Sequence, residues 1–276
     1  MRDSVPRRVT SAAFAAVLLA GGPVACGAGV ERDSAVADTP AAAVAKAARN
    51  SEDITSLHYR VSGTVPVKGH LEAEASMSTK PLAMSMKITA AAHLGGGGRL
   101  EIRFVDKVMY VRGDAIRPEK LRGRSWLSAA PAVWGRTGVD NQSYGVLPSQ
   151  LEGTPTVQST LLTGSKDLRL IGTETVDGAE TRHYKGTVNS EGLKLGRLDR
   201  FIQLRVSDPL TMDLWTDGDG RTKQFRMRAE GNDVATGTGN GPLDLTVTFL
   251  DVNQSLTIKA PPAVDTTPLL DDGQEG

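Results

Sequence analysis

Histidines, acidic turns and glycine runs are the features of this sequence that could support metal or nucleotide chemistry. The 4 histidines are scattered along the chain without the spacing of metal ligands. The segment 217–220, Asp-Gly-Asp-Gly, begins like a calcium-binding loop but lacks the closing glutamate, so we interpret it as a plain turn. The glycine run at 95–98 does not lead from a strand into a helix, which favours a hairpin loop over a phosphate-binding loop.

Sequence motifs for catalysis are absent as well. The chain contains no Gly-x-Ser-x-Gly elbow, no His-Glu-x-x-His and no phosphate-binding loop ending in Gly-Lys-Ser/Thr. Glu72 and Glu74 lie two residues apart and therefore on one strand face, where a solvated surface is the stronger interpretation. We expect a protein that is not an enzyme and that uses no metal or other cofactor.

The single cysteine, Cys26, follows an export signal. Arg2, Arg7 and Arg8 precede the apolar run 12–20, and small residues lead from there to Cys26. A basic start, a short apolar core and a small-residue exit are typical of a secretory signal peptide. The run is shorter than the roughly 20 apolar residues that span a bilayer. A lone cysteine also excludes an intrachain disulfide.

The exit of this signal resembles the bacterial lipobox, in which a small residue precedes a cysteine that is diacylated and becomes the mature amino terminus. Val24, Ala25 and Cys26 match that pattern, whereas Pro23 replaces the usual Leu, Val or Ile. The alternative is ordinary cleavage, which leaves Cys26 without a role. The lipobox implies lipidation at Cys26 and an exported protein that two acyl chains anchor stably to the outer face of the cell membrane.

Composition restricts the partners and the domain plan. The 32 Lys and Arg balance 32 Asp and Glu, so there is no basic excess to neutralise nucleic acid. Charged residues at 23% and hydrophobic residues at 39% fit a globular chain. We predict a signal peptide at 1–26, a flexible tether at 27–39, one folded domain at 40–264 and a disordered acidic tail at 265–276.

Apolar and polar residues alternate along most of the folded domain. The alternation is strict at 71–78 and recurs in later segments. This period is typical of an antiparallel sheet that is solvated on one side. Thr39-Pro40 and Thr154-Pro155 mark the starts of two helices. The patterns predict an α+β domain with about ten antiparallel strands and two helices.

Two segments carry a family resemblance. The segment 168–184, Leu-Arg-Leu-Ile-Gly-Thr-Glu-Thr-Val-Asp-Gly-Ala-Glu-Thr-Arg-His-Tyr, resembles the central hairpin of the LolA-like lipoprotein-carrier superfamily. The segment 213–220, Asp-Leu-Trp-Thr-Asp-Gly-Asp-Gly, is similar to that family's Trp-x-Asp-x-x-Gly hairpin. The resemblance extends over 40–264 and points to the actinobacterial branch of lipid-binding envelope lipoproteins. It implies a highly curved, half-open antiparallel sheet closed by helices over an apolar cavity.

This resemblance gives the apolar strand residues a second interpretation. Two neighbouring predicted strands are rich in methionine, whose flexible side chain suits surfaces that accept varied apolar shapes. Their apolar residues are either ordinary core or the wall of a ligand cavity. The predicted cavity wall comprises Met77, Leu82, Met84, Met86, Ile88, Ile102, Phe104, Leu161 and Leu162.

The long stretch 113–145 is predicted to be irregular, and long loops often serve as lids. We therefore expect Trp126 and Trp134 at the cavity mouth. The function implied is an exported lipoprotein that binds a lipid, a lipoglycan or another acylated molecule and carries it through the envelope. The alternative is an envelope sensor or regulatory protein that uses the same fold to bind a protein partner.

Overall fold

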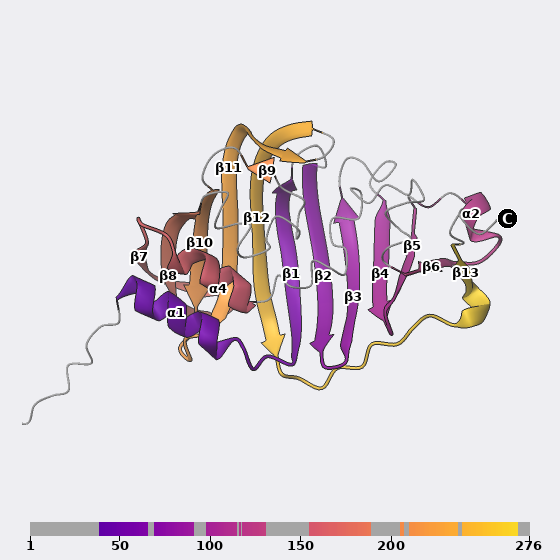
Figure 1. The fold of residues 1–276 in the computed structure, drawn as a ribbon, viewed down its shortest axis with the longest axis horizontal. Coiled ribbons are helices and arrows are strands. Elements are labelled where there is room, and N and C mark those ends of the chain that lie inside the picture. The colour runs from indigo at the N-terminus through magenta and orange to yellow at the C-terminus, as the bar shows by residue number, and fades with distance from the viewer. Residues whose placement is uncertain are drawn as a thin grey trace, which may run out of the picture. The chain divides into compact units, whose positions relative to one another are not determined.

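An open, mostly antiparallel sheet forms the body of the protein (Figure 1). The computed structural model describes residues 39–65, 69–90, 98–114, 116, 118–130, 155–188, 205–206, 210–236 and 239–269. Within these residues the sheet has 13 strands in the order β13-β6-β5-β4-β3-β2-β1-β12-β11-β10-β8-β7, and β9 pairs with β11 outside this path. β13 and β6 pair in parallel. Each of the strands β1 to β5 pairs antiparallel with both of its neighbours in the sheet.

The strands are β1 (Ser56–Val65), β2 (Gly69–Thr79), β3 (Leu82–Ala90), β4 (Arg99–Val105), β5 (Val108–Gly113), β6 (Trp126–Ala129), β7 (Arg169–Val176), β8 (Ala179–Val188), β9 (Arg205–Val206), β10 (Leu210–Thr216), β11 (Thr222–Thr236), β12 (Gly239–Val252) and β13 (Thr266–Pro268). The helices are α1 (Pro40–Asn50), α2 (Pro118–Leu121) and α4 (Pro155–Thr163), with a 3-10 turn, η2, at Ala263–Asp265. None of these helices is long and apolar enough to cross a membrane.

Alternating side chains give the sheet an apolar face and a polar face. On β2, Ala73, Ala75 and Met77 are buried, whereas Glu72 and Glu74 are exposed. Successive side chains of a strand point to opposite faces, and paired strands keep their residues in register, so the same division continues from strand to strand. The predicted one-sided alternation is confirmed.

Helices α1 and α4 pack against each other over the apolar face at β8 and β11 (Figure 1). α1 begins where predicted, because the Thr39 hydroxyl accepts a hydrogen bond from the Ala42 amide at 3.3 Å and Pro40 opens the first turn. α4 approaches β8 closely at Gly186, where a Cβ atom would lie 3.3 Å from the Leu162 side chain. These helices cover one part of the apolar face, and closure of the whole sheet over a cavity stays a prediction.

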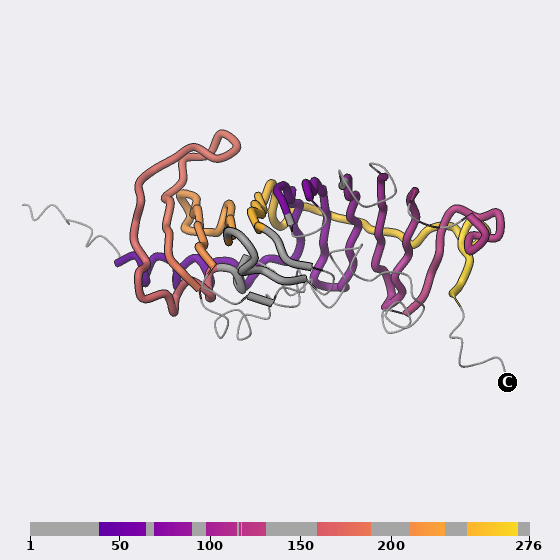
Figure 2. Tube along the Cα trace, turned by 90° about the horizontal axis from the view of Figure 1, so that it is seen from above, coloured from indigo at the N-terminus to yellow at the C-terminus, as the bar shows by residue number. Residues whose placement is uncertain are grey.

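The β7–β8 hairpin bends back toward the middle of the sheet (Figure 2). Its turn has positive φ at Asp177 (45°) and Gly178 (77°), as a two-residue Asp-Gly hairpin turn requires. Asp177 at the tip accepts a hydrogen bond from Arg60 of β1 at 3.2 Å, although four strands separate β1 from β7 in the sheet order. The hairpin therefore lies over the polar face.

The far edge of the sheet differs from the prediction. The stretch 113–145 was expected to be irregular, but its described part contains α2 and β6. The tail was expected to be disordered from residue 265, which is wrong for residues 266–268, because they form β13 and pair with β6. These two short strands and β9 raise the strand number above the predicted ten or so. β6 and β13 are far apart in the sequence, so their pairing leaves no local sequence pattern from which either strand could be predicted.

The residues between β12 and β13 follow one end of the strands to reach this edge (Figure 1, yellow). Arg103 Nη1 on β4 donates to the Lys259 carbonyl at 3.3 Å, and Arg124 Nη1 donates to the Ala263 carbonyl at 3.3 Å. The Ser125 amide donates to the Asp265 carbonyl at 3.1 Å. The carboxyl-terminal segment is thus held to the sheet along its length.

Candidate functional site

Most of the predicted cavity-wall residues come together on the apolar face. Two rows of side chains cross β1 to β6, because the register aligns one residue from each strand. One row consists of Leu57, Met77, Met84, Phe104, Met109 and Ala129, and the next consists of Tyr59, Ala75, Met86, Ile102, Val111 and Leu127. All of these side chains are buried in a single hydrophobic cluster, which also includes Ile88.

Every methionine within the described residues belongs to this cluster. Four of the positions lie on β2, β3 and β5, namely Met77, Met84, Met86 and Met109, and Met212 and Met227 lie under the helices on β10 and β11. Methionine side chains are unbranched and polarisable, so they adjust to irregular apolar shapes. The methionines can therefore fill irregular apolar space within this cluster.

Leu161 and Leu162 of α4 are buried in the same cluster. Leu162 lies over β8, where Gly186 leaves room for it. These two residues thus face the β8–β11 part of the sheet, in the same hydrophobic cluster as the methionine rows of β2 to β5.

Aromatic rings continue the apolar face towards the helices. The Tyr59 and Phe249 ring centroids lie 6.2 Å apart, as do those of Phe225 and Phe249. Burial raises the pKa of Tyr59 far above its usual value, so this phenol stays neutral. The apolar face consequently carries no charge at Tyr59.

Two predicted site residues lie elsewhere. Leu82 shares the strand phase of Met84 but is 46% exposed at the first residue of β3, so it does not belong to the buried wall. Trp126 was expected at a cavity mouth, but its ring lies under Arg103 and Arg112 on the polar face, whereas the next residue, Leu127, is on the apolar face. Trp134 and Cys26 lie outside the described residues.

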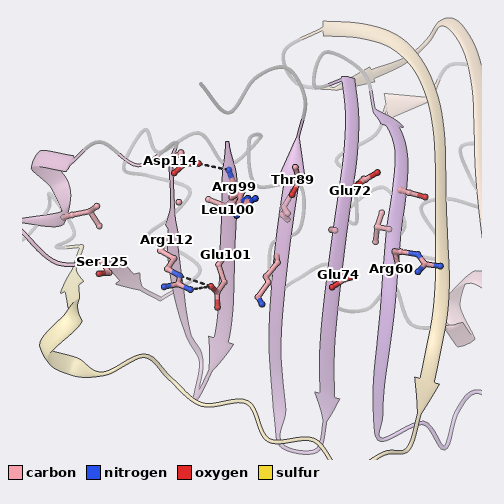
Figure 3. A pocket seen from close by; sticks show the side chains of 17 residues that line it. Arg60, Glu72, Glu74, Thr89, Arg99, Leu100, Glu101, Arg112, Asp114 and Ser125 are labelled. Carbon is pink, nitrogen blue, oxygen red and sulfur yellow. Dashed lines mark hydrogen bonds and ion pairs between the residues drawn. The ribbon is translucent and has the colours of Figure 1, made fainter. Parts of the chain in front are cut away.

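The polar face carries a row of alternating charges across the same strands (Figure 3). From β1 to β5 the row consists of Arg60, Glu74, Lys87, Glu101 and Arg112, and the Arg112 guanidinium lies over the Trp126 ring of β6. A groove of about 1210 Å³ follows these charged side chains. Opposite charges on neighbouring strands attract each other, so the row stabilises the sheet pairing.

Glu101 is the buried centre of this row. Its carboxylate accepts hydrogen bonds from Arg103 at 2.8 Å and from Arg112, and both guanidinium groups lie over the Trp126 ring, at 4.9 and 4.8 Å from its centroid. Burial alone would raise the pKa of Glu101, but the hydrogen bonds and charges of Arg103 and Arg112 outweigh burial and lower it. Glu101 is therefore a paired anion and not a proton donor.

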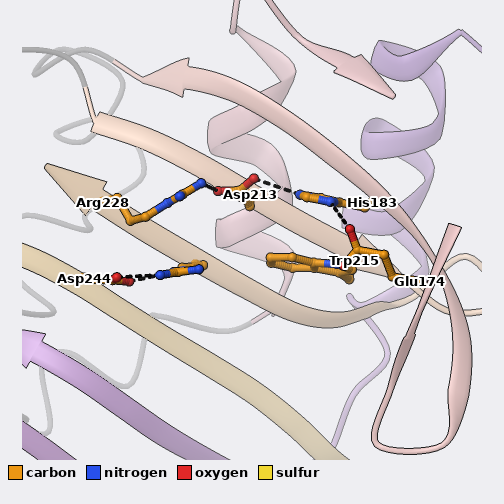
Figure 4. Close-up of polar contacts among 7 residues, drawn as sticks. Glu174, His183, Asp213, Trp215, Arg228 and Asp244 are labelled. Atoms are coloured by element: carbon orange, nitrogen blue, oxygen red, sulfur yellow. Dashed lines mark hydrogen bonds and ion pairs between the residues drawn. The ribbon is translucent and has the colours of Figure 1, made fainter. Parts of the chain in front are cut away.

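A second polar cluster joins β7, β8, β10 and β11 (Figure 4). His183 lies between Glu174 and Asp213, Trp215 Nε1 donates to Glu174 at 2.9 Å, and Arg228 donates to Asp213. This cluster was not predicted, because His183 is one of four histidines that are scattered along the sequence. The Asp-Gly turn could have predicted the contact between Glu174 and His183. These two residues flank the turn at positions that become diagonal neighbours in a hairpin.

The described residues contain no group of three or more His, Cys, Asp and Glu side chains that could hold a metal ion. The acidic segment 217–220 forms a turn in which the Gly220 amide donates to the Asp217 carbonyl at 2.9 Å. Its interpretation as a plain turn is consistent with this hydrogen bond.

Comparison with known proteins identifies the fold. No family model matches the chain. The lipoprotein LppX of Mycobacterium tuberculosis has a TM-score of 0.50 and 16% identity, covering 80% of this chain and 98% of that one. LprF of Mycobacterium bovis has a TM-score of 0.53 and 13% identity, covering 80% and 96%. This likeness shows the fold: the sheet of this chain is similar to those of two mycobacterial lipoproteins, which agrees with the fold that the sequence resemblance implied.

A sequence relative occurs in Streptomyces griseus. It is described as an uncharacterized 31.2 kDa protein in the rplA-rplJ intergenic region and is 25% identical over 189 residues. The alignment covers 64% of this chain and 59% of that protein. The chain therefore spans about three fifths of the length of this relative.

Proposed function

We propose that this protein is an exported lipoprotein that binds a lipid or another acylated molecule on the apolar face of its sheet. The observation that carries the proposal is the pair of methionine-containing rows across β1 to β6, which gather Met84, Met86 and Ile102 on one face of the sheet. Burying an acyl chain against such a face stabilises a complex by about 25 cal/mol per Å² of apolar surface. No covalent chemistry is needed for this function.

The fold supports the same proposal. LppX is described as a lipoprotein, and the alignment with this protein covers 98% of the LppX chain. The sequence adds a signal peptide that ends at the only cysteine, Cys26. We propose that Cys26 is diacylated, that it anchors the protein to the outer face of the cell membrane, and that residues 27–39 tether the domain.

The proposal is tested by analysing the lipid that accompanies the protein. The anchored protein is purified from its native host in a mild detergent and examined by native mass spectrometry. We expect a bound apolar ligand in addition to the anchor, and its release on unfolding. The Cys26→Ala form lacks the proposed diacyl anchor and is purified without detergent. Any lipid that is found with this form is therefore a bound ligand.

The second arm of the test uses a fluorescent acyl probe. We expect the Cys26→Ala protein to bind the probe at a single saturable site after its native lipid is extracted. The native lipid should displace the probe, and a water-soluble headgroup analogue should not. A delipidated, folded protein that neither carries native lipid nor binds the probe would refute the proposal.

A further inference from the structure

His183 lies between two carboxylates from different strands (Figure 4). Its Nδ1 atom is 2.7 Å from Glu174 Oε1 of β7, and its Nε2 atom is 2.8 Å from Asp213 Oδ1 of β10. The imidazole also stacks on Trp215 of β10, with the ring centroids 4.3 Å apart and the planes at 16°. The ring is therefore held in one orientation, with both nitrogens directed at acceptors.

This geometry specifies a protonation state. A neutral imidazole has one N–H group, and an ionised carboxylate can only accept, so both contacts are hydrogen bonds only when the ring carries two protons. Hydrogen bonds from Trp215 and from His183 lower the pKa of Glu174, which favours its ionised form. Arg228 donates to the second oxygen of Asp213. The arrangement thus fits an imidazolium between two carboxylates.

The charged groups around His183 come from every neighbouring strand. Glu174 faces it from β7 and Asp213 from β10, and Arg228 reaches Asp213 from β11. The register places Lys185 of β8 and Arg226 of β11 on either side of Asp213, on the same face. Arg226 donates to Asp244 at 2.6 Å. Among the described residues, Glu174 and Asp213 are the groups in direct hydrogen-bonding contact with the ring.

We propose that His183 is a proton-dependent clasp that joins the edge strand β7 to β10. When the ring loses one proton, one of its nitrogens presents a lone pair to a carboxylate, and that contact becomes repulsive. The Asp213 side chain is 2% exposed and is also held by Arg228, whereas the Glu174 side chain is 47% exposed. Glu174 is therefore the carboxylate that moves away from the ring, and β7 loosens while the contact of His183 with Asp213 remains.

The consequence concerns the hairpin that lies over the polar face. β7 is an edge of the sheet, and β8 is its partner strand. Glu174 is the β7 side chain that reaches over His183 to the Trp215 indole. Loss of the His183 contact leaves Glu174 held by Trp215 alone, so β7 is held less firmly while the pairing of β8 with β10 stays intact. The clasp thus makes the mobility of one sheet edge depend on pH.

The test measures the protonation of His183 and the amide exchange of β7 in the same sample. The protonation of His183 is measured by ¹⁵N–¹H correlation spectra of the soluble Cys26→Ala protein over a pH series. Amide protection factors, which are corrected for intrinsic exchange, are measured at each pH for β7 and β10. We expect β7 amides to exchange about tenfold faster once the ring has lost a proton, with β10 unchanged, because a charged hydrogen bond has been lost.

Two variants isolate the cause. Glu174→Gln and His183→Gln should make β7 exchange independent of the ring's protonation, whereas His70→Gln, at an exposed histidine–glutamate pair, should retain the wild-type behaviour. A ring with a single N–H group throughout the pH range of the folded protein would overturn the proposal. Proton loss without a change in β7 protection, or an unchanged pH dependence in His183→Gln, would also overturn it.

Discussion

Met86 on β3 pairs across the sheet with Ile102 on β4, and neither side chain has any exposed surface. On the opposite side of the same two strands, Lys87 pairs with Glu101. One residue step along β3 therefore changes the environment from an apolar cluster to a row of charges. This relationship provides matched positions for testing what the apolar face does.

Met86→Trp should lower the binding of a fluorescent acyl probe severalfold, because the indole fills space on the apolar face. Overpacking of a filled core costs about 1–3 kcal/mol, so the variant should remain folded. Binding is measured by titration and stability by urea unfolding. Lys87→Trp adds comparable bulk on the polar face and should bind like the wild type. Unchanged binding with a clear loss of stability in Met86→Trp would identify Met86 as ordinary core.

Glu101→Gln should destabilise the protein by about 1–3 kcal/mol, since two guanidinium groups lose their charged acceptor. The folded pKa of Glu101 is lowered, so its contribution to stability is present above the unfolded pKa of about 4.3 and is lost as the pH falls through the folded pKa. The stability difference between variant and wild type should accordingly shrink between about pH 5 and pH 2.

Urea midpoints of both proteins across this pH range measure the effect. Glu74→Gln is the control, because Glu74 belongs to the same charged row but is exposed. It should change the midpoint by much less than Glu101→Gln at neutral pH. An equal effect of both substitutions would show that the pairing at Glu101 adds nothing beyond general surface charge.

Cys26→Ala should release the protein from the membrane fraction, because Cys26 is the only residue that can carry the proposed diacyl anchor. Carbonate washing followed by immunoblotting of the pellet and the supernatant measures the release. The wild-type protein should remain in the pellet. A variant that also stays there would mean that Cys26 is incidental and that another part of the protein holds the membrane.

Trp126→Phe should leave the fluorescence response to an acyl ligand unchanged, because the Trp126 ring lies on the polar face under Arg103 and Arg112. Trp134 lies outside the described residues, and we propose that it borders the cavity mouth, so Trp134→Phe should remove most of the ligand-dependent shift. Each single variant is titrated with the same lipid. A response that disappears in Trp126→Phe and persists in Trp134→Phe would reverse this assignment.

The parts of the fold that could be predicted are those with a local signal. Alternation at 71–78 gave β2 and its two faces, and Thr39-Pro40 gave the start of α1. The face of Trp126 could not be predicted, because β6 has only 4 residues and becomes a strand through its pairing with β5 and β13. Leu82 has the correct phase but lies at the strand end, and an end position is not visible in the alternation.

The pairing of Thr266 with Trp126 sets an order of events for synthesis and folding. β6 precedes most of the sheet in the chain, but its outer partner β13 lies near residue 268. Until the residues up to 268 have been synthesised, β6 remains an open strand edge that can pair with other nascent chains. Truncation from the carboxyl terminus would leave this edge open permanently, so quality control in the cell should recognise shortened chains at β6.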